Sequence, residues 1–252
     1  HRIRYTHSDM QDLQRHLGES HGYRRKLIVT DGVFSMDGEI AKLSEICDLA
    51  ERYDALVMVD DSHATGYIGE RGRGTTEYCG VEGRVDIIST TFGKALGGAS
   101  GGCISAKAPI IATLRQRSRP YLFSNTLAPA VVGGTLKVLT LLENENPYRE
   151  LTMKRAQQFR SLMHQAGFDL IPGETAIVPV MLHDEHLALA MADALLDEGI
   201  YVIGFSYPVV PRNEARIRVQ LSASHSDEDV QAAVAAFIRV RDALSSAHQE
   251  RG

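Results

Sequence analysis

Cysteine is scarce in this sequence, and this limits the chemistry that its thiols can support. The 252 residues include 3 cysteines, and Cys47, Cys79 and Cys103 lie far apart along the chain. An odd number at this spacing indicates neither a disulfide framework nor a set of metal ligands. We therefore expect reduced thiols, no metal site, and a cytoplasmic protein, or a mitochondrial one if the source is eukaryotic.

Long apolar runs and an excess of positive charge are missing as well. No apolar stretch approaches the roughly 20 residues that a membrane-spanning helix requires, so no segment is predicted to cross a bilayer. The formal net charge of -5 argues against nucleic acid or an anionic membrane as the main partner. With 44% hydrophobic and 23% charged residues, the composition is that of a globular protein with one large domain or two ordinary ones.

The sequence also lacks the two common glycine-rich nucleotide motifs. Lys94 lies between glycines but is followed by Ala95 rather than Ser or Thr, which excludes a phosphate-binding loop of the Walker type. No G-x-G-x-x-G joins a predicted strand to a predicted helix, which excludes a dinucleotide-binding fingerprint. The chain begins at His1 with neither a signal peptide nor a transit-like segment, and we expect that it begins partway through a fold.

The patterns that are present indicate alternating strands and helices. Apolar runs at 27–30, 55–60, 85–89 and 101–105 predict strands, and apolar residues recur at helical spacing over 41–53. The first two runs are continuous, which is typical of strands buried on both faces of a parallel sheet. This alternation predicts an α/β fold with ligands at the carboxyl ends of its strands.

The second half of the chain changes character after a predicted hinge. The expected elements are, in order, a helix at 109–119, an irregular loop at 120–125, a helix at 128–142, the hinge at 143–147, a helix at 148–166, a strand at 176–182, a helix at 186–198, strands at 200–204 and 215–221, and a helix at 227–244 capped by Ser226. We therefore divide the chain into the C-terminal part of a large domain, 1–143, and a small α+β domain, 144–252.

Polar residues follow the ends of several predicted strands. Ser35, Asp60, His63 and Lys94 each lie just after an apolar run. An amine between glycines can carry a covalent cofactor, and an acid at a strand end is the partner that a pyridinium nitrogen needs, as in pyridoxal phosphate (PLP) chemistry. Each residue type also has an ordinary interpretation, because such lysines are often solvated turn residues and such acids are often caps. The convergence of all four at strand ends favours a cofactor site.

Four motifs, taken in order, carry a resemblance to a known family. They are Asp31-Gly-Val-Phe-Ser-Met-Asp-Gly38, Val59-Asp-Asp-Ser-His-Ala-Thr-Gly66, Gly69-Glu-Arg-Gly-Arg-Gly74 and Thr91-Phe-Gly-Lys-Ala-Leu-Gly-Gly98. They resemble the α-oxoamine synthases, fold-type I PLP enzymes that join an amino acid to an acyl-CoA. Three further stretches are most similar to the members that use glycine and acetyl-CoA: Tyr53 to His63, Arg115 to Asn125, and Tyr207 to Pro211 with Ala215 to Arg218.

The resemblance implies a fold and a reaction. The fold would be the α/β, aspartate aminotransferase-like architecture of fold-type I enzymes, with a mostly parallel sheet in the large domain. The reaction would join glycine to acetyl-CoA to give 2-amino-3-ketobutyrate, or cleave that keto acid with CoA in threonine breakdown. The resemblance also implies a homodimer with shared active sites and functional coupling to a threonine dehydrogenase. Family members carry an N-terminal portion ahead of the point where this chain begins, so the chain resembles a truncated member.

The resemblance further implies roles for single residues around the cofactor. Lys94 would hold PLP covalently and remove the Cα proton of the substrate, and Asp60 would keep the pyridine nitrogen protonated. His63 would hydrogen-bond the phenolic oxygen of PLP. Ser35 would lie near the edge of the ring, and Thr91 would give its hydroxyl to the phosphate.

A second group of residues would bind the substrate or the neighbouring subunit. Ser124, Asn125 and Thr126 would reach the cofactor phosphate in the site of the partner subunit. Arg218 would bind the α-carboxylate of the amino acid, because a planar guanidinium pairs with a carboxylate bidentately. Arg216, two residues earlier on the same predicted strand, is expected to point to the opposite face.

Several alternatives remain open on the sequence alone. Asp61 competes with Asp60 for the pyridine nitrogen, although neighbouring strand residues alternate faces and Asp61 is expected to be structural. His63 could instead be a capped surface residue, and the hydroxyl of Ser35 could satisfy its own turn. The chain could also be a different α-oxoamine synthase, such as 8-amino-7-oxononanoate synthase, which uses alanine and a longer acyl chain. A last alternative is an inactive partner subunit, although such partners typically lose the lysine that this chain keeps.

Overall fold

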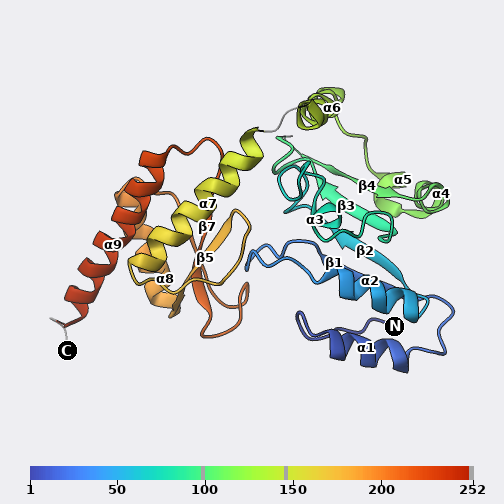
Figure 1. The fold of residues 1–252 in the computed structure, drawn as a ribbon, viewed down its shortest axis with the longest axis horizontal. Helices are drawn as coiled ribbons and strands as arrows, with labels where there is room; N and C mark the ends of the chain where they lie inside the picture. Colours follow the sequence, from blue (N-terminus) through green and yellow to red (C-terminus); the bar gives the residue numbers. More distant parts are fainter. Residues whose placement is uncertain (98–99, 145–146, 250–252) are drawn as a thin grey trace. The chain divides into compact units, whose positions relative to one another are not determined.

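The chain forms two compact units, which are described separately. The computed structural model describes residues 1–97, 100–144 and 147–249 (Figure 1). The first unit comprises His1–Phe34 and Ile40–Asn146, and the second unit comprises Ser35–Glu39 and Pro147–Gly252.

A four-stranded sheet forms the centre of the first unit. Its strands are, in spatial order, β1 (Leu27–Asp31), β2 (Leu56–Asp60), β3 (Ile87–Thr91) and β4 (Gly102–Ala106). The first three run parallel, with Asp31 opposite Asp60 and Asp60 opposite Ser89, whereas β4 pairs antiparallel with β3. The predicted mostly parallel sheet is therefore confirmed. The carboxyl ends of β1, β2 and β3 meet at one edge of it.

Helices α1 (Met10–Glu19) and α2 (Leu43–Arg52) cover one face of this sheet. They share a buried cluster with alternate residues of β1 and β2, which includes Leu13, Leu17, Leu43, Ile46, Ile28, Val57 and Val59. The intervening side chains are uncovered, since Leu27 and Val29 are 50% and 55% exposed. The prediction that these strands are buried on both faces is thus wrong for the described residues, because side chains alternate along a strand and these helices cover one side.

Four further helices complete the described part of the first unit. They are α3 (Thr75–Tyr78), α4 (Ala108–Arg117), α5 (Arg119–Phe123) and α6 (Pro129–Asn144). The irregular loop predicted at 120–125 is wrong over residues 120–123, because α5 occupies them. Pro120 is accommodated there because a proline in the first turn of a helix removes an N–H that would have no partner in the helix.

The second unit is built around a three-stranded antiparallel sheet. Its strands lie in the order β5 (Ile177–His183), β7 (Ala215–Gln220), β6 (Ile203–Phe205), and helices α7 (Pro147–Gln165), α8 (Glu185–Asp197) and α9 (Asp227–Gln249) pack around it. The strand predicted at 200–204 is shorter and begins at Ile203. In the predicted hinge, α6 continues to Asn144 and α7 begins at Pro147, while residues 145–146 lie outside the described part of the chain.

The helices of the second unit meet over an aromatic core. Phe237 of α9 packs edge-on against Phe159 and Phe168, with ring centroids 6.0 and 5.8 Å apart. The predicted cap of α9 is confirmed: the Ser226 Oγ accepts from the N–H of Asp229 at 3.0 Å, and the Asp229 carboxylate accepts from the N–H of Ser226 at 2.8 Å. This reciprocal pair is a capping box. In the described residues no helix is both long and apolar enough to span a membrane.

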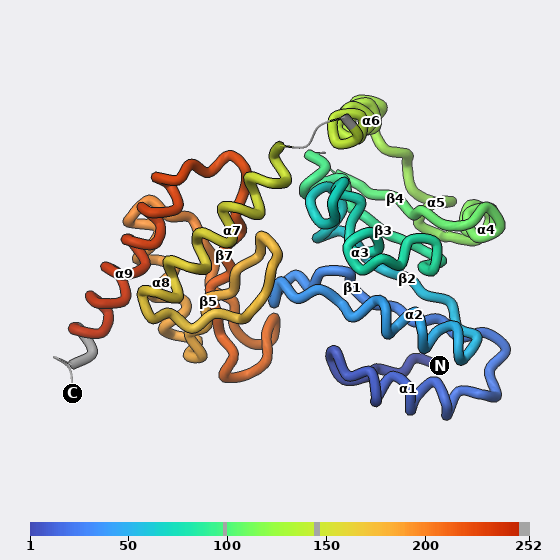
Figure 2. The backbone as a smooth tube through the Cα atoms, in the orientation of Figure 1, coloured from blue at the N-terminus to red at the C-terminus, as the bar shows by residue number. Residues whose placement is uncertain are grey.

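The segment Ser35–Glu39 belongs to the second unit although it lies between β1 and α2 in the sequence. The backbone trace in Figure 2 shows the chain passing from β1 through this segment and on to α2. The Thr175 hydroxyl donates to the carbonyl of Gly38 at 2.9 Å. Gly38 has a φ of +69°, and a Cβ there would lie 2.6 Å from the carbonyl oxygen of Ile177. Glycine therefore permits this close approach, which brings Ser35 to β7.

Candidate active site

Asp60 ends β2 and presents an ordered carboxylate. Its Oδ1 accepts from the N–H of Ser62 at 3.0 Å, and its Oδ2 accepts from the hydroxyl of Ser89 at 2.9 Å. Burial acts to raise the pKa of Asp60, but the hydrogen bonds from Ser62 and Ser89 and the charge of Lys94 outweigh it, and the pKa is lowered. Asp60 is therefore ionised at neutral pH.

Asp61 has a different environment. Its side chain is fully buried, and it accepts hydrogen bonds from both the N–H and the hydroxyl of Thr75. A Cβ at Gly74 would lie 1.7 Å from its Oδ2, and one at Gly32 would lie 2.1 Å from its Oδ1. Burial raises the pKa of Asp61. Of the two acids, Asp60 is the accessible one, and Asp61 anchors the turn that leads into α3.

Lys94 lies in the loop that follows β3, with its side chain exposed. Within the described ranges its ammonium group makes no hydrogen bond and no ion pair. Its charge nevertheless acts on two carboxyls, Asp60 and Asp31, and in each case favours the ionised form. Burial and the neighbouring charge of Asp60 outweigh this effect at Asp31, and its pKa is raised. The sheet edge thus gathers an amine, an ionised acid and a second, less acidic carboxyl.

Thr91 and His63 belong to the same edge of the sheet. The Thr91 hydroxyl donates to the carbonyl of Gly101 at 3.1 Å and accepts from the N–H of Gly93 at 3.1 Å. It therefore orders the backbone just before Lys94. The carbonyl of His63 accepts from the Tyr67 hydroxyl at 2.7 Å, which fixes the turn that carries the imidazole. The roles of both side chains toward a cofactor stay predictions.

Ser124, Asn125 and Thr126 lie in the exposed segment between α5 and α6. In the described part of the chain, no hydrogen bond joins them to Asp60 or Lys94. Their predicted contact with a partner subunit stays a prediction.

Arg218 and Ser35 meet in the second unit. The Arg218 Nη1 donates to the carbonyl of Ser35 at 3.0 Å, and its guanidinium carbon lies 5.2 Å from the ring centroid of Phe205. Burial lowers the pKa of Arg218. The peptide carbonyl and the aromatic face hold the guanidinium in place while leaving N–H groups for a ligand.

Arg216 lies on the same face of β7 as Arg218. Its Nη1 donates to the Asp37 carboxylate at 2.6 Å and to the Met36 carbonyl at 3.4 Å, and its side chain is 1% exposed. Both arginines therefore reach the segment that contains Ser35. The expectation that Arg216 points to the opposite face is wrong, because residues two apart on a strand share a face.

Asp31 and Ser89 are the functional candidates that the sequence analysis missed. Both are defined by register, since each lies directly opposite Asp60 on a neighbouring strand. A usable signal was that each ends or nearly ends a predicted apolar run. Strand ends that are far apart in sequence become neighbours once the strands pair.

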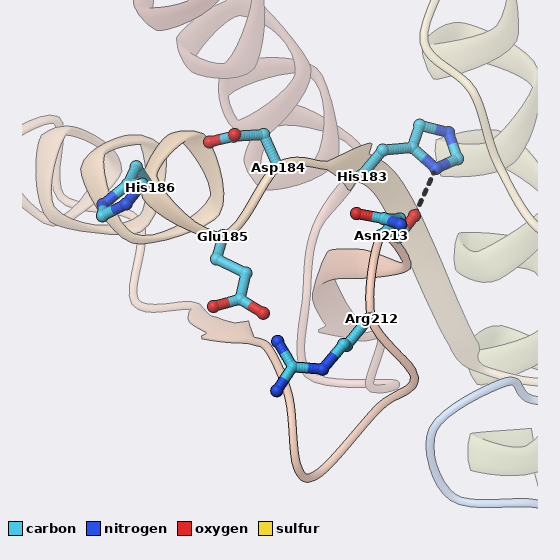
Figure 3. Close-up of a pocket in the computed structure, with 6 residues that line it drawn as sticks. All are labelled: His183, Asp184, Glu185, His186, Arg212 and Asn213. Atoms are coloured by element: carbon cyan, nitrogen blue, oxygen red, sulfur yellow. Dashed lines mark hydrogen bonds between the residues drawn. The ribbon is translucent and has the colours of Figure 1, made fainter.

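One pocket lies apart from the predicted site residues, in the second unit. It is lined by residues at the end of β5, the start of α8 and the turn before β7 (Figure 3): His183, Asp184, Glu185, His186, Arg212 and Asn213. Glu185 and Arg212 point toward one another across it. In the ranges that the structure describes, no group of three or more His, Cys, Asp or Glu residues is arranged to hold a metal ion.

The sequence matches one family model over most of its length. The family model described as aminotransferase class I and II matches residues 1–237. The chain belongs to this family. The assignment confirms the expected fold-type I architecture, and the mixed sheet of the first unit agrees with it.

Relatives within the aminotransferase class I and II family are similar over nearly the whole chain. It is 56% identical to 2-amino-3-ketobutyrate coenzyme A ligase of Escherichia coli K12, covering 95% of this chain and 61% of the relative. The chain is 43% identical to 8-amino-7-oxononanoate synthase of Thermoanaerobacter pseudethanolicus, over 96% of this chain and 61% of the relative. A variant of serine palmitoyltransferase from S. paucimobilis, solved with a bound PLP–myriocin aldimine, superposes with a TM-score of 0.92 at 32% identity, over 97% of this chain and 62% of that one. The chain thus spans about three fifths of the length of these proteins.

Proposed function

We propose that this chain is part of a PLP-dependent acyltransferase that condenses glycine with acetyl-CoA to 2-amino-3-ketobutyrate and, in reverse, cleaves that keto acid with CoA. The observation that carries the proposal is that an ionised Asp60 and Lys94 follow neighbouring strands of one sheet, and that the charge of Lys94 acts on Asp60 while its amine makes no hydrogen bond among the described residues. The choice of substrates is supported by the higher identity to the ligase than to the oxononanoate synthase, 56% against 43%.

The donor set at the sheet edge fits PLP. An ionised carboxylate suits a protonated pyridine nitrogen, an accessible amine suits an aldehyde, and an imidazole suits a phenolic oxygen. Asp60, Lys94 and His63 supply these three groups from two adjacent turns. Thr91 would contribute its hydroxyl at the phosphate, after exchanging its present bond to Gly101.

When bound, PLP supplies an electron sink for the negative charge that develops at the Cα of the amino acid. The residues of the chain hold the cofactor and move protons. The Lys94 Nζ would hold the cofactor covalently. Once the substrate amine has replaced Lys94 on the cofactor, the freed Nζ would take the Cα proton. Asp60 would keep the ring nitrogen protonated, since a charge-assisted hydrogen bond to a carboxylate favours the cationic form.

Arg218 would bind the carboxylate of the amino acid. Its Nη1 is used by the Ser35 carbonyl, and a planar guanidinium presents further donors in fixed directions. Ser35 would therefore act through its backbone carbonyl, which orients Arg218, rather than through its hydroxyl. In this reaction the carboxylate is retained in the product, so Arg218 would hold it throughout.

The wider setting is part of the same proposal. The family resemblance supports a homodimer in which Ser124, Asn125 and Thr126 contribute to the partner's site, a cytoplasmic location, and coupling to a threonine dehydrogenase. Residues 1–143 would belong to the PLP-binding large domain and 144–252 to the small domain. The alternative of an inactive partner subunit is disfavoured because the chain keeps Asp60 and Lys94.

The test is covalent trapping of PLP on Lys94. The protein is incubated with PLP, reduced with borohydride, digested and mapped by mass spectrometry; we expect the label on the peptide that contains Lys94. Lys94→Ala should carry no label. Lys107→Ala, which alters an exposed lysine directly after the last residue of β4, should label normally. Equal labelling of Lys94→Ala would refute the assignment. Glycine with acetyl-CoA should then be turned over faster than alanine with a longer acyl-CoA, and the opposite order would favour the oxononanoate synthase alternative.

A further inference from the structure

Ser89 of β3 lies directly opposite Asp60 of β2. Its hydroxyl donates to Oδ2 at 2.9 Å while the N–H of Ser62 donates to Oδ1 at 3.0 Å. Each carboxylate oxygen thus accepts a hydrogen bond from a different part of the chain. Two donors on two oxygens fix the plane of a carboxylate, whereas a single donor leaves it free to rotate about the Cβ–Cγ bond.

We propose that Ser89 is a positioning residue, whose hydroxyl holds the carboxylate of Asp60 in the orientation that the cofactor's pyridine nitrogen requires. It acts through Asp60 and touches neither cofactor nor substrate. The inference rests on the proposed function, because PLP is what gives Asp60 this task. Ser62, from the turn after β2, donates its backbone N–H to Oδ1, and its side chain also lowers the pKa of Asp60. The hydroxyl of Ser89 is the donor that reaches Oδ2 from the neighbouring strand.

The surroundings of Asp60 make this hydrogen bond consequential. Asp31 on β1 and Asp61 in the next position are acidic neighbours, and the charge of Lys94 opposes them. A hydroxyl that donates to a carboxylate stabilises its ionised form. Without Ser89, Asp60 would take up a proton at higher pH and would pair less firmly with a cationic ring.

The next residue on the strand provides a matched control. Thr90 points to the other face of the strand from Ser89, and its Oγ1 is buried without a hydrogen-bond partner in the described residues. Thr90→Val therefore removes a hydroxyl from β3 without removing a hydrogen bond. Ser89→Ala removes the donor to Asp60, and Ser89→Thr keeps a hydroxyl at the same position.

The first measurement is the titration of the Asp60 carboxyl carbon by ¹³C NMR, in the protein without PLP. We expect the midpoint to move upward in Ser89→Ala, to return toward the parent value in Ser89→Thr, and to stay unchanged in Thr90→Val. An unchanged midpoint in Ser89→Ala would overturn the inference. If Ser89→Ala does not fold, Ser89→Cys, which is nearly isosteric and a weak donor, should show the same upward direction.

The second measurement is the dissociation constant of PLP and the pH dependence of the absorbance of the bound cofactor. Loss of one charge-assisted hydrogen bond on Asp60 should weaken PLP binding about tenfold in Ser89→Ala, with recovery in Ser89→Thr. If the parent binds PLP and Ser89→Ala binds it equally well with an unchanged pH profile, the inference alone is overturned. If the parent does not bind PLP at all, the proposed function fails and the inference fails with it.

Discussion

The buried carboxylate of Asp61 accepts two hydrogen bonds from Thr75, one from its backbone N–H and one from its hydroxyl. The side chain of Asp61 is fully buried, and both Gly32 and Gly74 leave room for it. This contact fixes the turn that follows Asp60 and His63. A structural acid thus supports the neighbouring acid that faces the proposed cofactor.

Asp61→Ala is expected to destabilise the fold. It would leave the N–H and hydroxyl of Thr75 buried without an acceptor, at a cost of about 2–4 kcal/mol in the free energy of unfolding. Denaturant titration at neutral pH measures the difference. Asp48→Ala is the control, because that carboxylate is 64% exposed and pairs with Arg84 at the surface, where a salt bridge contributes little. Equal losses in the two variants would contradict the structural role of Asp61.

The pair formed by Arg216 and Asp37 holds the segment Ser35–Glu39 to β7. Arg216→Ala would leave the Asp37 carboxylate and the Met36 carbonyl without this donor, and we expect a loss of about 3 kcal/mol in the free energy of unfolding. Arg216→Lys should recover only part of it, because an ammonium cannot reproduce the planar fork. Chemical denaturation checks both variants.

Arg239 provides the matched control for Arg216. Its side chain is 57% exposed and pairs with Glu198. Arg239→Ala should change the free energy of unfolding by less than about 1 kcal/mol. If Arg239→Ala lowered the free energy of unfolding as much as Arg216→Ala, burial of the guanidinium would not explain the effect of Arg216.

The apolar runs in the sequence predict the strands of both units because a short run of apolar residues between polar ones is a local pattern that strands favour. They cannot show what covers the second face, so Leu27 and Val29 were expected to be buried and are exposed. Contacts that depend on register are equally invisible. Ser89 donates to Asp60 from the neighbouring strand. Arg216 donates to Asp37, which lies 179 residues earlier in the sequence. The wrong direction expected for Arg216 is a different kind of error. Side chains two residues apart on a strand point to the same face, so the sequence alone places Arg216 and Arg218 together.

His183 should titrate at a pKa that depends on Asp169. Its Nε2 lies 3.0 Å from the Asp169 carboxylate and its Nδ1 lies 3.2 Å from the Asn213 carbonyl, beside the pocket in Figure 3. These hydrogen bonds raise the pKa of His183. Asp169→Asn should therefore lower the midpoint of the His183 ring proton shift in an NMR titration.

The sign of the effect on stability follows from the raised pKa of His183. The contribution of the protonated pair is fully present below the unfolded pKa of histidine, about 6.5, and is lost as the pH rises through the higher folded pKa. The parent should thus exceed Asp169→Asn in stability at mildly acidic pH, and the difference should shrink in alkaline solution. Denaturation curves at several pH values check this, and a gap that widens with rising pH would contradict it.

Arg218→Ala should weaken binding of the amino acid more than it slows the chemical step. The guanidinium is held by the Ser35 carbonyl and the Phe205 ring and is assigned to the substrate carboxylate. Removing a charged hydrogen-bonding partner of a carboxylate costs about 1.5–3 kcal/mol, or roughly 10- to 150-fold in KM for glycine. The KM for acetyl-CoA should change little, because the acyl donor does not need this contact. Arg239→Ala leaves both constants at the parent values, and an unchanged KM for glycine in Arg218→Ala would remove Arg218 from the site.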